Sequence, residues 1–595
     1  MTARRRRLPF GAEPDAGGTR FRVRAPACDT LALRLADGRR VAMRRDASGW
    51  FSADVEAAGP GMRYALELAS GDCVPDPASR FQPGAVEGES EVVDPAAYAW
   101  HDADWYGRPW REALAYELHV GCFGGDFDGV RRYLDHLERL GVTAVELMPV
   151  AAFAGARNWG YDGVLPFAPD ASYGRPEALK RLVDACHERG VMALLDVVYN
   201  HFGPSGNHLA RYAPDFFHPE VHTPWGAALA FDNPAVREFF IENALYWLQE
   251  FHFDGLRLDA VHAIESVNGG AGFLRELAER VRAETAGRHV HLVLENDRNE
   301  AHWLPRDGAP GLYTAQWNDD FHHAAHVVAT GEDDGYYADY IGAPVRYLAK
   351  SLAEGFAYQG EPSTFRDGRR RGEPSAGVTP SAFVDFLQNH DQVGNRALGE
   401  RLGGSASLAR RRALYVLLML SPPVPLLFMG EEWDAATPFL FFCDFPGDLG
   451  DAVREGRRDE FRRFAAFGSR RRRAAIPDPN AVQTYRRSRL DWDEPRHRPH
   501  ADWLAFMVRL AACRRSELVP RLKGAASGQW RMLSRAAFVV EWPLGAGERW
   551  QVAANFGEER VTLARAGRVI HGAPDDDADL AADGARVTLV GGRGA

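Results

Sequence analysis

Polar and apolar residues tend to alternate at both ends of the chain. Four stretches near the start share this pattern: 19–24, 30–35, 49–55 and 64–68. A period of two is typical of strands with one buried face, and turn-rich clusters between such strands are typical of a sandwich. The pattern predicts an N-terminal β-sandwich over residues 1–97, with the Pro-, Asp- and Gly-rich passage 72–97 as its linker. Three similar stretches near the end, 538–542, 550–555 and 586–590, predict a C-terminal β-sandwich over residues 516–595.

Between residues 98 and 515 short apolar runs alternate with amphipathic stretches. The apolar runs are 114–120, 144–148, 191–198, 256–259, 290–295, 315–317, 383–387 and 425–429. Helical periodicity marks the ranges 127–140, 176–189, 234–251 and 273–286. Eight strands that alternate with helices predict an α/β fold, a parallel (β/α)8 TIM barrel. An open doubly wound sheet is the alternative, but no G-x-G-x-x-G motif supports it.

Charged residues follow several of these predicted strands directly. The fourth strand ends at Arg257 and Asp259, the fifth ends at Glu295, and the seventh leads into Asp391. Active sites of TIM barrels form where the carboxyl ends of the strands meet, so these side chains are expected in one place. Each residue alone is more simply explained as structural, and Arg257 with Asp259 as an ion pair. Together, three carboxylates at one face indicate catalysis.

The predicted carboxylates fit retaining glycoside hydrolysis. That reaction needs two carboxyl groups about 5–5.5 Å apart, one as nucleophile and one as general acid/base. Arg257 is placed to keep Asp259 ionised, as a nucleophile requires. Glu295 follows the apolar run 290–294, where burial and a second carboxylate favour the protonated form that an acid needs.

Composition excludes several other classes of protein. The net charge of −11 argues against nucleic acid as the main partner, and no apolar run is long enough to span a membrane. No apolar segment follows the basic N-terminus, so a signal peptide is not expected. The six cysteines are scattered without a C-x-x-C pair, which argues against zinc and dithiol sites and favours a cytoplasmic protein with reduced thiols.

Five stretches resemble the α-amylase superfamily of glycoside hydrolases, and more narrowly its maltooligosyltrehalose trehalohydrolase family. They are DVVYNHFGP at 196–204, LRLDAVHAI at 256–264, ENDRN at 295–299, QWNDDFHH at 316–323 and FLQNHDQVGNR at 386–396. The first two are widely shared in the superfamily, and the last three are more specific. The resemblance covers most of the chain and implies that the N-terminal sandwich is similar to carbohydrate-binding modules.

The resemblance implies a role for each matching residue. Asp259 is the expected nucleophile, Glu295 the general acid/base and Asp391 the stabiliser of the transition state. The remaining residues, with Arg257, are expected to bind substrate: His201 and His390 at sugar hydroxyls, Tyr161 stacked on the same sugar, and His262, Asp320, His323, Gln392 and Asn395 on the leaving-group side. Many superfamily members have Lys where this chain has His262, which disfavours an ordinary α-amylase.

The implied reaction is hydrolysis of the α-1,4 bond next to the terminal trehalose unit of maltooligosyltrehalose, which releases trehalose. This reaction needs no cofactor, and because the sequence shows no ligand cluster for calcium, no metal is expected. The resemblance implies a functional partner, maltooligosyltrehalose synthase, that supplies the substrate. Three alternatives stay open: a glucan branching or debranching enzyme, a plain maltooligosaccharide hydrolase, and a non-catalytic α-glucan-binding protein. Scaffolds have no need to keep three costly carboxylates in one pocket, which argues against the last.

Overall fold

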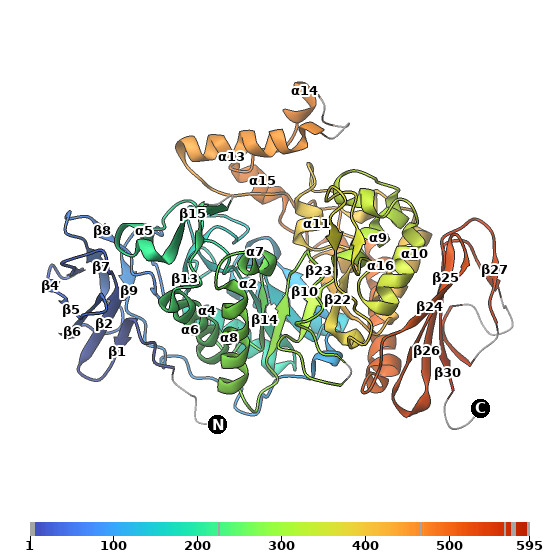
Figure 1. The fold of residues 1–595 in the computed structure, drawn as a ribbon, viewed down its shortest axis with the longest axis horizontal. Coiled ribbons are helices and arrows are strands. Elements are labelled where there is room, and N and C mark those ends of the chain that lie inside the picture. The colour runs from blue at the N-terminus through green and yellow to red at the C-terminus, as the bar shows by residue number, and fades with distance from the viewer. Residues whose placement is uncertain are drawn as a thin grey trace.

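The chain folds into a central barrel with a β-sheet unit at either side (Figure 1). A computed structural model describes residues 6–223, 226–306, 308–463, 467, 469–564, 567–572 and 579–591. The N-terminal sheets lie at one end of the long axis and the C-terminal sheets at the other, so the barrel separates them. Along these residues no helix is long and apolar enough to cross a membrane.

The predicted TIM barrel is confirmed. Eight parallel strands close in sequence order: β10 Ala115–Leu118, β11 Ala144–Leu147, β14 Met192–Val197, β17 Gly255–Leu258, β18 His291–Leu294, β19 Ala315–Trp317, β22 Phe383–Phe386 and β23 Val424–Phe428. Each falls within one residue of a predicted apolar run, because barrel strands are buried on both faces and read as continuous apolar segments.

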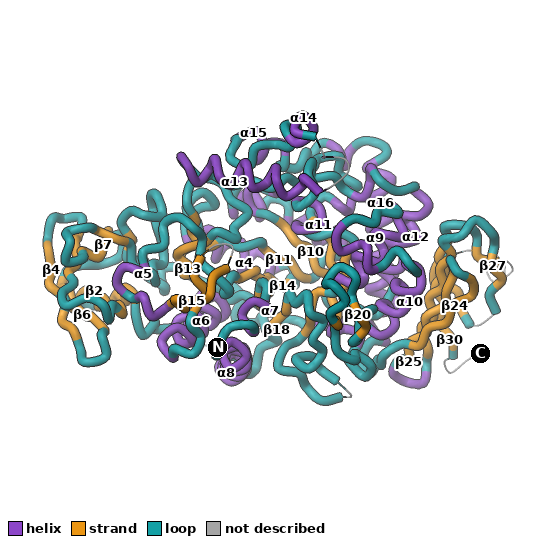
Figure 2. The backbone as a smooth tube through the Cα atoms, turned by 45° about the horizontal axis from the view of Figure 1, so that its top comes forward, coloured by secondary structure: helices purple, strands orange, loops and turns teal. Residues whose placement is uncertain are grey.

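Helices follow most of these strands, and Figure 2 shows them around the barrel. The longer ones are α4 Pro176–Glu188, α6 Pro234–Glu250, α8 Gly270–Glu284, α9 Asp319–Thr330, α10 Pro344–Glu354, α12 Leu408–Leu420, α13 Gly447–Glu460 and α16 His500–Cys513. The predicted helix over 127–140 is instead two helices, α2 Phe127–Arg131 and α3 Leu134–Leu140. Tyr133 leaves helical geometry between them and stacks on Trp492, with ring centroids 3.7 Å apart.

The N-terminal unit has two antiparallel sheets, as predicted. One contains β1 Gly11–Pro14, β2 Gly18–Arg24, β6 Trp50–Glu56 and β5 Arg44–Arg45. The other contains β4 Arg40–Ala42, β3 Ala32–Leu35, β7 Arg63–Glu67, β8 Cys73–Val74 and β9 Ser90–Glu91.

The passage 72–97, predicted as a linker, instead contributes two strands to the N-terminal unit. Strands β8 and β9 both pair with β7. Arg80 is buried and donates to Glu13 of β1 at 2.6 Å and to Glu250 of α6 at 3.2 Å. Turn-forming residues made the passage resemble a linker, whereas this long-range ion pair ties it to the barrel.

The C-terminal unit also has two sheets. The larger has the strand order β24 Gln529–Ser534, β25 Ala537–Pro543, β26 Arg549–Asn555, β30 Gly584–Val590 and β28 Arg568–His571, and the smaller pairs β27 Val561–Thr562 with β29 Asp579–Leu580. The boundaries predicted at residues 97 and 515 stay predictions.

Side chains inside the barrel form an apolar layer with a charged layer above it. The apolar cluster includes Ala115, Ala144, Met192, Leu194, Val293, Trp317 and Phe386. Glu117, Glu146 and Asp196 lie two residues further along their strands, Arg257 lies beside Asp196 on β17, and all four are buried. Because strand side chains have period two, the charged residues point to the same interior, at the carboxyl ends of the strands.

Replacing Arg80 is expected to destabilise the protein. R80A leaves the carboxylates of Glu13 and Glu250 buried without their main partner, so the free energy of unfolding should fall by about 3–5 kcal/mol. Denaturant unfolding measures this change.

The control is R24A, which removes another contact between the N-terminal unit and the barrel. Arg24 pairs with Asp215, whose side chain is 41% exposed, so the loss should stay below about 1 kcal/mol. Equal losses in the two variants would contradict the interpretation that burial makes the Arg80 pair important.

Candidate active site

A cavity of about 680 Å3 lies at the carboxyl ends of the barrel strands. The three predicted catalytic carboxylates, Asp259, Glu295 and Asp391, all line it. Five of the predicted substrate-binding residues line it as well: Tyr161, His201, His262, His390 and Asn395. Residues far apart in the sequence therefore converge on one open space.

Arg257 lies beneath this cavity and is fully buried. Its Nη1 donates to Asp259 Oδ1 at 2.7 Å and to both carboxylate oxygens of Asp196 at 2.9 Å. Its Nη2 lies 3.9 Å from Glu295 Oε2, and its guanidinium lies 4.3 Å from the ring centroid of Trp317. One cation thus connects the ends of three neighbouring strands, β14, β17 and β18.

Asp259 has both carboxylate oxygens occupied by donors. Besides Arg257 at Oδ1, the side chain of Asn200 donates to Oδ2 at 3.0 Å. Donors of this kind favour the ionised carboxylate. The next residue, Ala260, has φ of 43°, a left-handed conformation that turns the chain out of β17 into α7 Val261–Glu265.

The Ala260 turn also contacts the second carboxylate. The backbone N–H of Ala260 donates to Glu295 Oε2 at 2.5 Å. Burial raises the pKa of Glu295, Arg257 and His262 lower it, and the nearby charges of Asp259 and Asp391 raise it, with a net rise. A carboxyl group that holds its proton beside an ionised carboxylate is suited to general acid catalysis.

Asp391 is the most exposed of the three, with 44% of its side chain accessible. Asn395 donates to its Oδ1 at 3.0 Å, and His390 Nε2 lies 3.4 Å from the same oxygen. On the other side of the imidazole, His390 Nδ1 lies 2.5 Å from Glu117 Oε1. Burial alone would lower the pKa of His390, but Asp391 and Glu117 raise it to about 9.

Tyr161 and the two other histidines complete the walls. The Tyr161 ring stacks on His390 at 4.9 Å, and its hydroxyl donates to Asp196 at 2.5 Å. His201 Nε2 lies 3.0 Å from the carbonyl oxygen of Tyr161, and burial lowers the pKa of this histidine. His262 Nδ1 lies 3.6 Å from Asp297 Oδ1.

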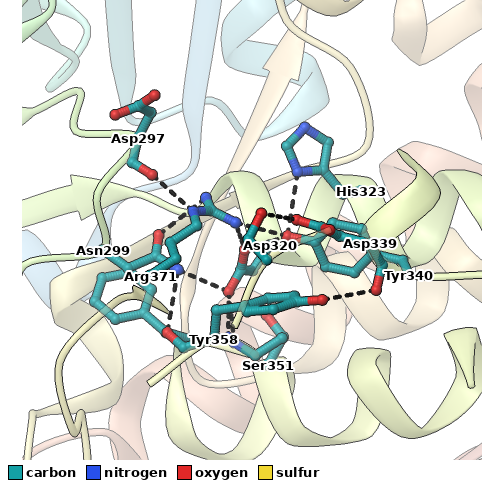
Figure 3. A network of polar contacts seen from close by, with 12 residues as sticks. Asp297, Asn299, Asp320, His323, Asp339, Tyr340, Ser351, Tyr358 and Arg371 are labelled. Atoms are coloured by element: carbon teal, nitrogen blue, oxygen red, sulfur yellow. Dashed lines mark hydrogen bonds and ion pairs between the residues drawn. The ribbon is translucent and has the colours of Figure 1, made fainter. Parts of the chain in front are cut away.

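Asp320 does not face the cavity, which corrects the sequence prediction. Its carboxylate is fully buried and accepts from Arg371 at 2.6 Å, Asn299 at 2.8 Å, and the backbone N–H groups of Ala357 and Tyr358. Figure 3 shows it at the centre of this network. With its oxygens occupied by protein donors, Asp320 fixes the loops behind the cavity and has no oxygen left to meet a sugar.

His323 and Gln392 also lie outside the lining of the cavity. His323 is buried, with Nδ1 at 3.4 Å from the hydroxyl of Tyr340. Gln392 accepts from the hydroxyl of Tyr336 at 3.1 Å. Both residues support the aromatic side chains of residues 336–340, and their predicted contact with substrate stays a prediction.

Sequence reasoning missed several residues that build the site. Asn200 and Asp196 lie in a quoted motif but were not predicted as site residues. Glu117, at the end of the first barrel strand, could have been found by the same rule that found Asp259 and Glu295. Phe441 lines the cavity from a loop with no sequence signal.

Several known proteins are similar to this chain in sequence and in architecture. Residues 78–216 match the family described as alpha amylase, catalytic domain, and residues 525–591 match a domain of unknown function. A protein of Rhizobium sp. (strain M-11) named malto-oligosyltrehalose trehalohydrolase is 40% identical over 600 residues, which cover 97% of both chains. A protein of Deinococcus radiodurans with the same name is 42% identical over 87% of this chain and 84% of its own length.

The chain belongs to the malto-oligosyltrehalose trehalohydrolase family. It is therefore a glycoside hydrolase of the α-amylase type. Among solved structures, a Salmonella typhimurium protein assigned to the alpha amylases is 45% identical with a TM-score of 0.93, covering 98% of this chain and 100% of its own. A branching enzyme of Aliivibrio fischeri is a more distant relative, 31% identical over 48% of this chain and 41% of its own length.

The charge state of His390 is expected to depend on Glu117. With a pKa of about 9, the wild-type imidazole is protonated at pH 7.5. Because this pKa lies above the ordinary value of 6.5, the ion pair contributes stability below about pH 6.5 and loses it as the pH rises through 9. E117Q removes one of the two raising charges and should lower the pKa of His390, measured by NMR titration of the ring.

The matched control is E112Q, on the turn before β10, where Glu112 pairs with Arg108 at 3.2 Å. It should leave the titration of His390 unchanged. A wild-type midpoint near 6.5, or the same midpoint in E117Q, would refute the assigned ion pair.

Proposed function

We propose that this enzyme hydrolyses the α-1,4 bond next to the terminal trehalose unit of maltooligosyltrehalose and releases trehalose. The observation that carries the mechanism is the contact of one buried guanidinium, Arg257, with Asp259 and its approach to Glu295. Arg257 holds two carboxyl groups at the wall of one cavity, one proposed as the nucleophile and the other as the general acid, as a retaining glycosidase requires. The names of the relatives support the choice of substrate.

In the first step Glu295 gives its proton to the glycosidic oxygen while Asp259 attacks the anomeric carbon. The bond from that carbon to the leaving oxygen breaks, and an ester bond to Asp259 forms. Trehalose departs with the proton. The raised pKa of Glu295 keeps the proton available, and Asn200 and Arg257 hold the carboxylate of Asp259, the proposed nucleophile, with one donor on each oxygen.

In the second step the ionised Glu295 takes a proton from water, and the water oxygen attacks the anomeric carbon. The ester bond to Asp259 breaks, so the shortened maltooligosaccharide leaves with retained configuration. Asp391, the most exposed of the three carboxylates, offers negative charge to the positive charge that develops on the sugar ring in both transition states. His390, held by Glu117, is placed to donate to a sugar hydroxyl.

The proposed function also implies a source for the substrate and a location for the enzyme. An oligosaccharide as substrate is consistent with the glycoside hydrolase family. We infer that maltooligosyltrehalose synthase supplies the substrate, that both act in the cytoplasm, and that residues 1–97, 98–515 and 516–595 form separate structural units. Catalysis as written uses protein groups alone, without a cofactor or metal.

Product analysis tests the choice of substrate. The enzyme should release trehalose from maltooligosyltrehalose and change maltoheptaose and glycogen little, as measured by chromatography of the products. New α-1,6 branches in glycogen would favour the branching enzyme, the second candidate that the Aliivibrio fischeri relative suggests. Rapid cleavage of maltoheptaose would instead favour a plain maltooligosaccharide hydrolase.

Substitution of the two carboxyl groups tests their roles. D259N and E295Q should each lower kcat by orders of magnitude, with about 10²–10⁴-fold expected for loss of the general acid, while folding survives. The wild-type rate should fall as the pH rises through the pKa of Glu295, which lies above its ordinary 4.5, because the first step needs the protonated form. In E295Q the residual rate should no longer fall with rising pH in this range. Near-normal turnover in either variant would reject the role assigned to that residue.

A further inference from the structure

Helix α13 lies outside the barrel in both views of the molecule (Figures 1 and 2). Only two of its residues, Gly450 and Arg457, are buried. Leu449 and Val453, near its start, pack against a small apolar cluster. The later half of the helix is therefore held mainly by Arg457, which is a long charged side chain that points inward.

Arg457 reaches the end of the short helix that carries Asp391. Its Nη2 donates to the carbonyl oxygen of Gly394 at 2.9 Å and to that of Arg396 at 3.1 Å. Gly394 is the last residue of α11 His390–Gly394, and the carbonyl groups at a helix end lack partners within the helix. Arg457 thus supplies the donors that fix where α11 ends.

The same guanidinium contacts the cavity wall from behind. It lies 5.5 Å from the ring centroid of Phe441, which lines the cavity, and 4.7 Å from that of Phe461. Arg457 itself does not line the cavity. Arg457 therefore contacts α11 and Phe441, which both contribute to the cavity wall, without lining the cavity that substrate would fill.

The ion pair of Arg457 is with a partly exposed glutamate, so the pair itself contributes little to stability. Its Nη1 donates to Glu460 at 2.8 Å, and 53% of the Glu460 side chain is exposed. Loss of Arg457 would leave that carboxylate in water, where an unpaired charge costs little. The main effect of losing Arg457 would be the loss of its two hydrogen bonds to the carbonyl groups of Gly394 and Arg396.

We propose that Arg457 is a positioning residue that holds α11, and with it Asp391, in the geometry that hydrolysis needs. The inference rests on the function proposed above. Asn395, between the two bonded carbonyl groups, donates to Asp391 Oδ1 at 3.0 Å, which gives a direct chain of contacts from α13 to the carboxylate. A displacement of about 1 Å at a reacting group can cost about 10²-fold in rate.

Kinetics of three variants test the proposal. R457M keeps an unbranched apolar side chain and removes the donors, so kcat for trehalose release should fall about 10- to 100-fold, with a smaller change in KM. R457K keeps one charged donor and should recover part of the loss. The control R458M removes the next arginine, whose one hydrogen bond among the described residues is to Glu455 of its own helix at 3.1 Å, and should leave kcat unchanged.

A double-mutant cycle separates positioning from a general loss of structure. If Arg457 acts through Asp391, R457M should change kcat little in a D391N background, because the group that it positions is already disabled. Equal losses in the two backgrounds, a wild-type kcat in R457M, or no recovery in R457K would each overturn the inference. Failure of the wild-type enzyme to release trehalose would instead overturn the proposed function.

Discussion

The guanidinium of Arg257 dictates how the strand ends of this barrel are arranged. A fully buried cation is costly unless carboxylates surround it, so β14, β17 and β18 must deliver Asp196, Asp259 and Glu295 to it. The same requirement brings together Asp259, the proposed nucleophile, and Glu295, the proposed general acid. Folding and chemistry thus depend on one interaction: the charge that the barrel must neutralise is also the charge that contacts Asp259, the proposed nucleophile.

Local patterns predicted the features that depend on local sequence. All eight barrel strands were predicted because each is a continuous apolar run. Asp259, Glu295 and Asp391 were expected at one face because they follow such runs, and all three line the cavity. Pairings between distant residues could not be read in this way. The passage 72–97 resembled a linker because Glu250, the partner of Arg80, lies 170 residues away.

The same limit explains why Asp320 was placed wrongly. Its motif resembles one that faces substrate, yet its partner Arg371 lies 51 residues later, on a short hairpin that the pattern of apolar residues does not reveal. Sequence indicates which polar residues reach the carboxyl ends of the strands. Whether such a residue meets solvent or another side chain depends on loops, and loops contribute both the Asp320 network and Phe441.

The charged layer beneath the cavity closes the barrel from below, since Glu117, Glu146, Asp196 and Arg257 are all buried. Sugar and water must then both enter the cavity from the side away from this layer. The water that cleaves the ester would arrive through the place that trehalose has just left, so departure precedes hydrolysis. A second sugar that occupied this place first would compete with water for the glycosyl group, and the enzyme would then lengthen a glucan instead of shortening one.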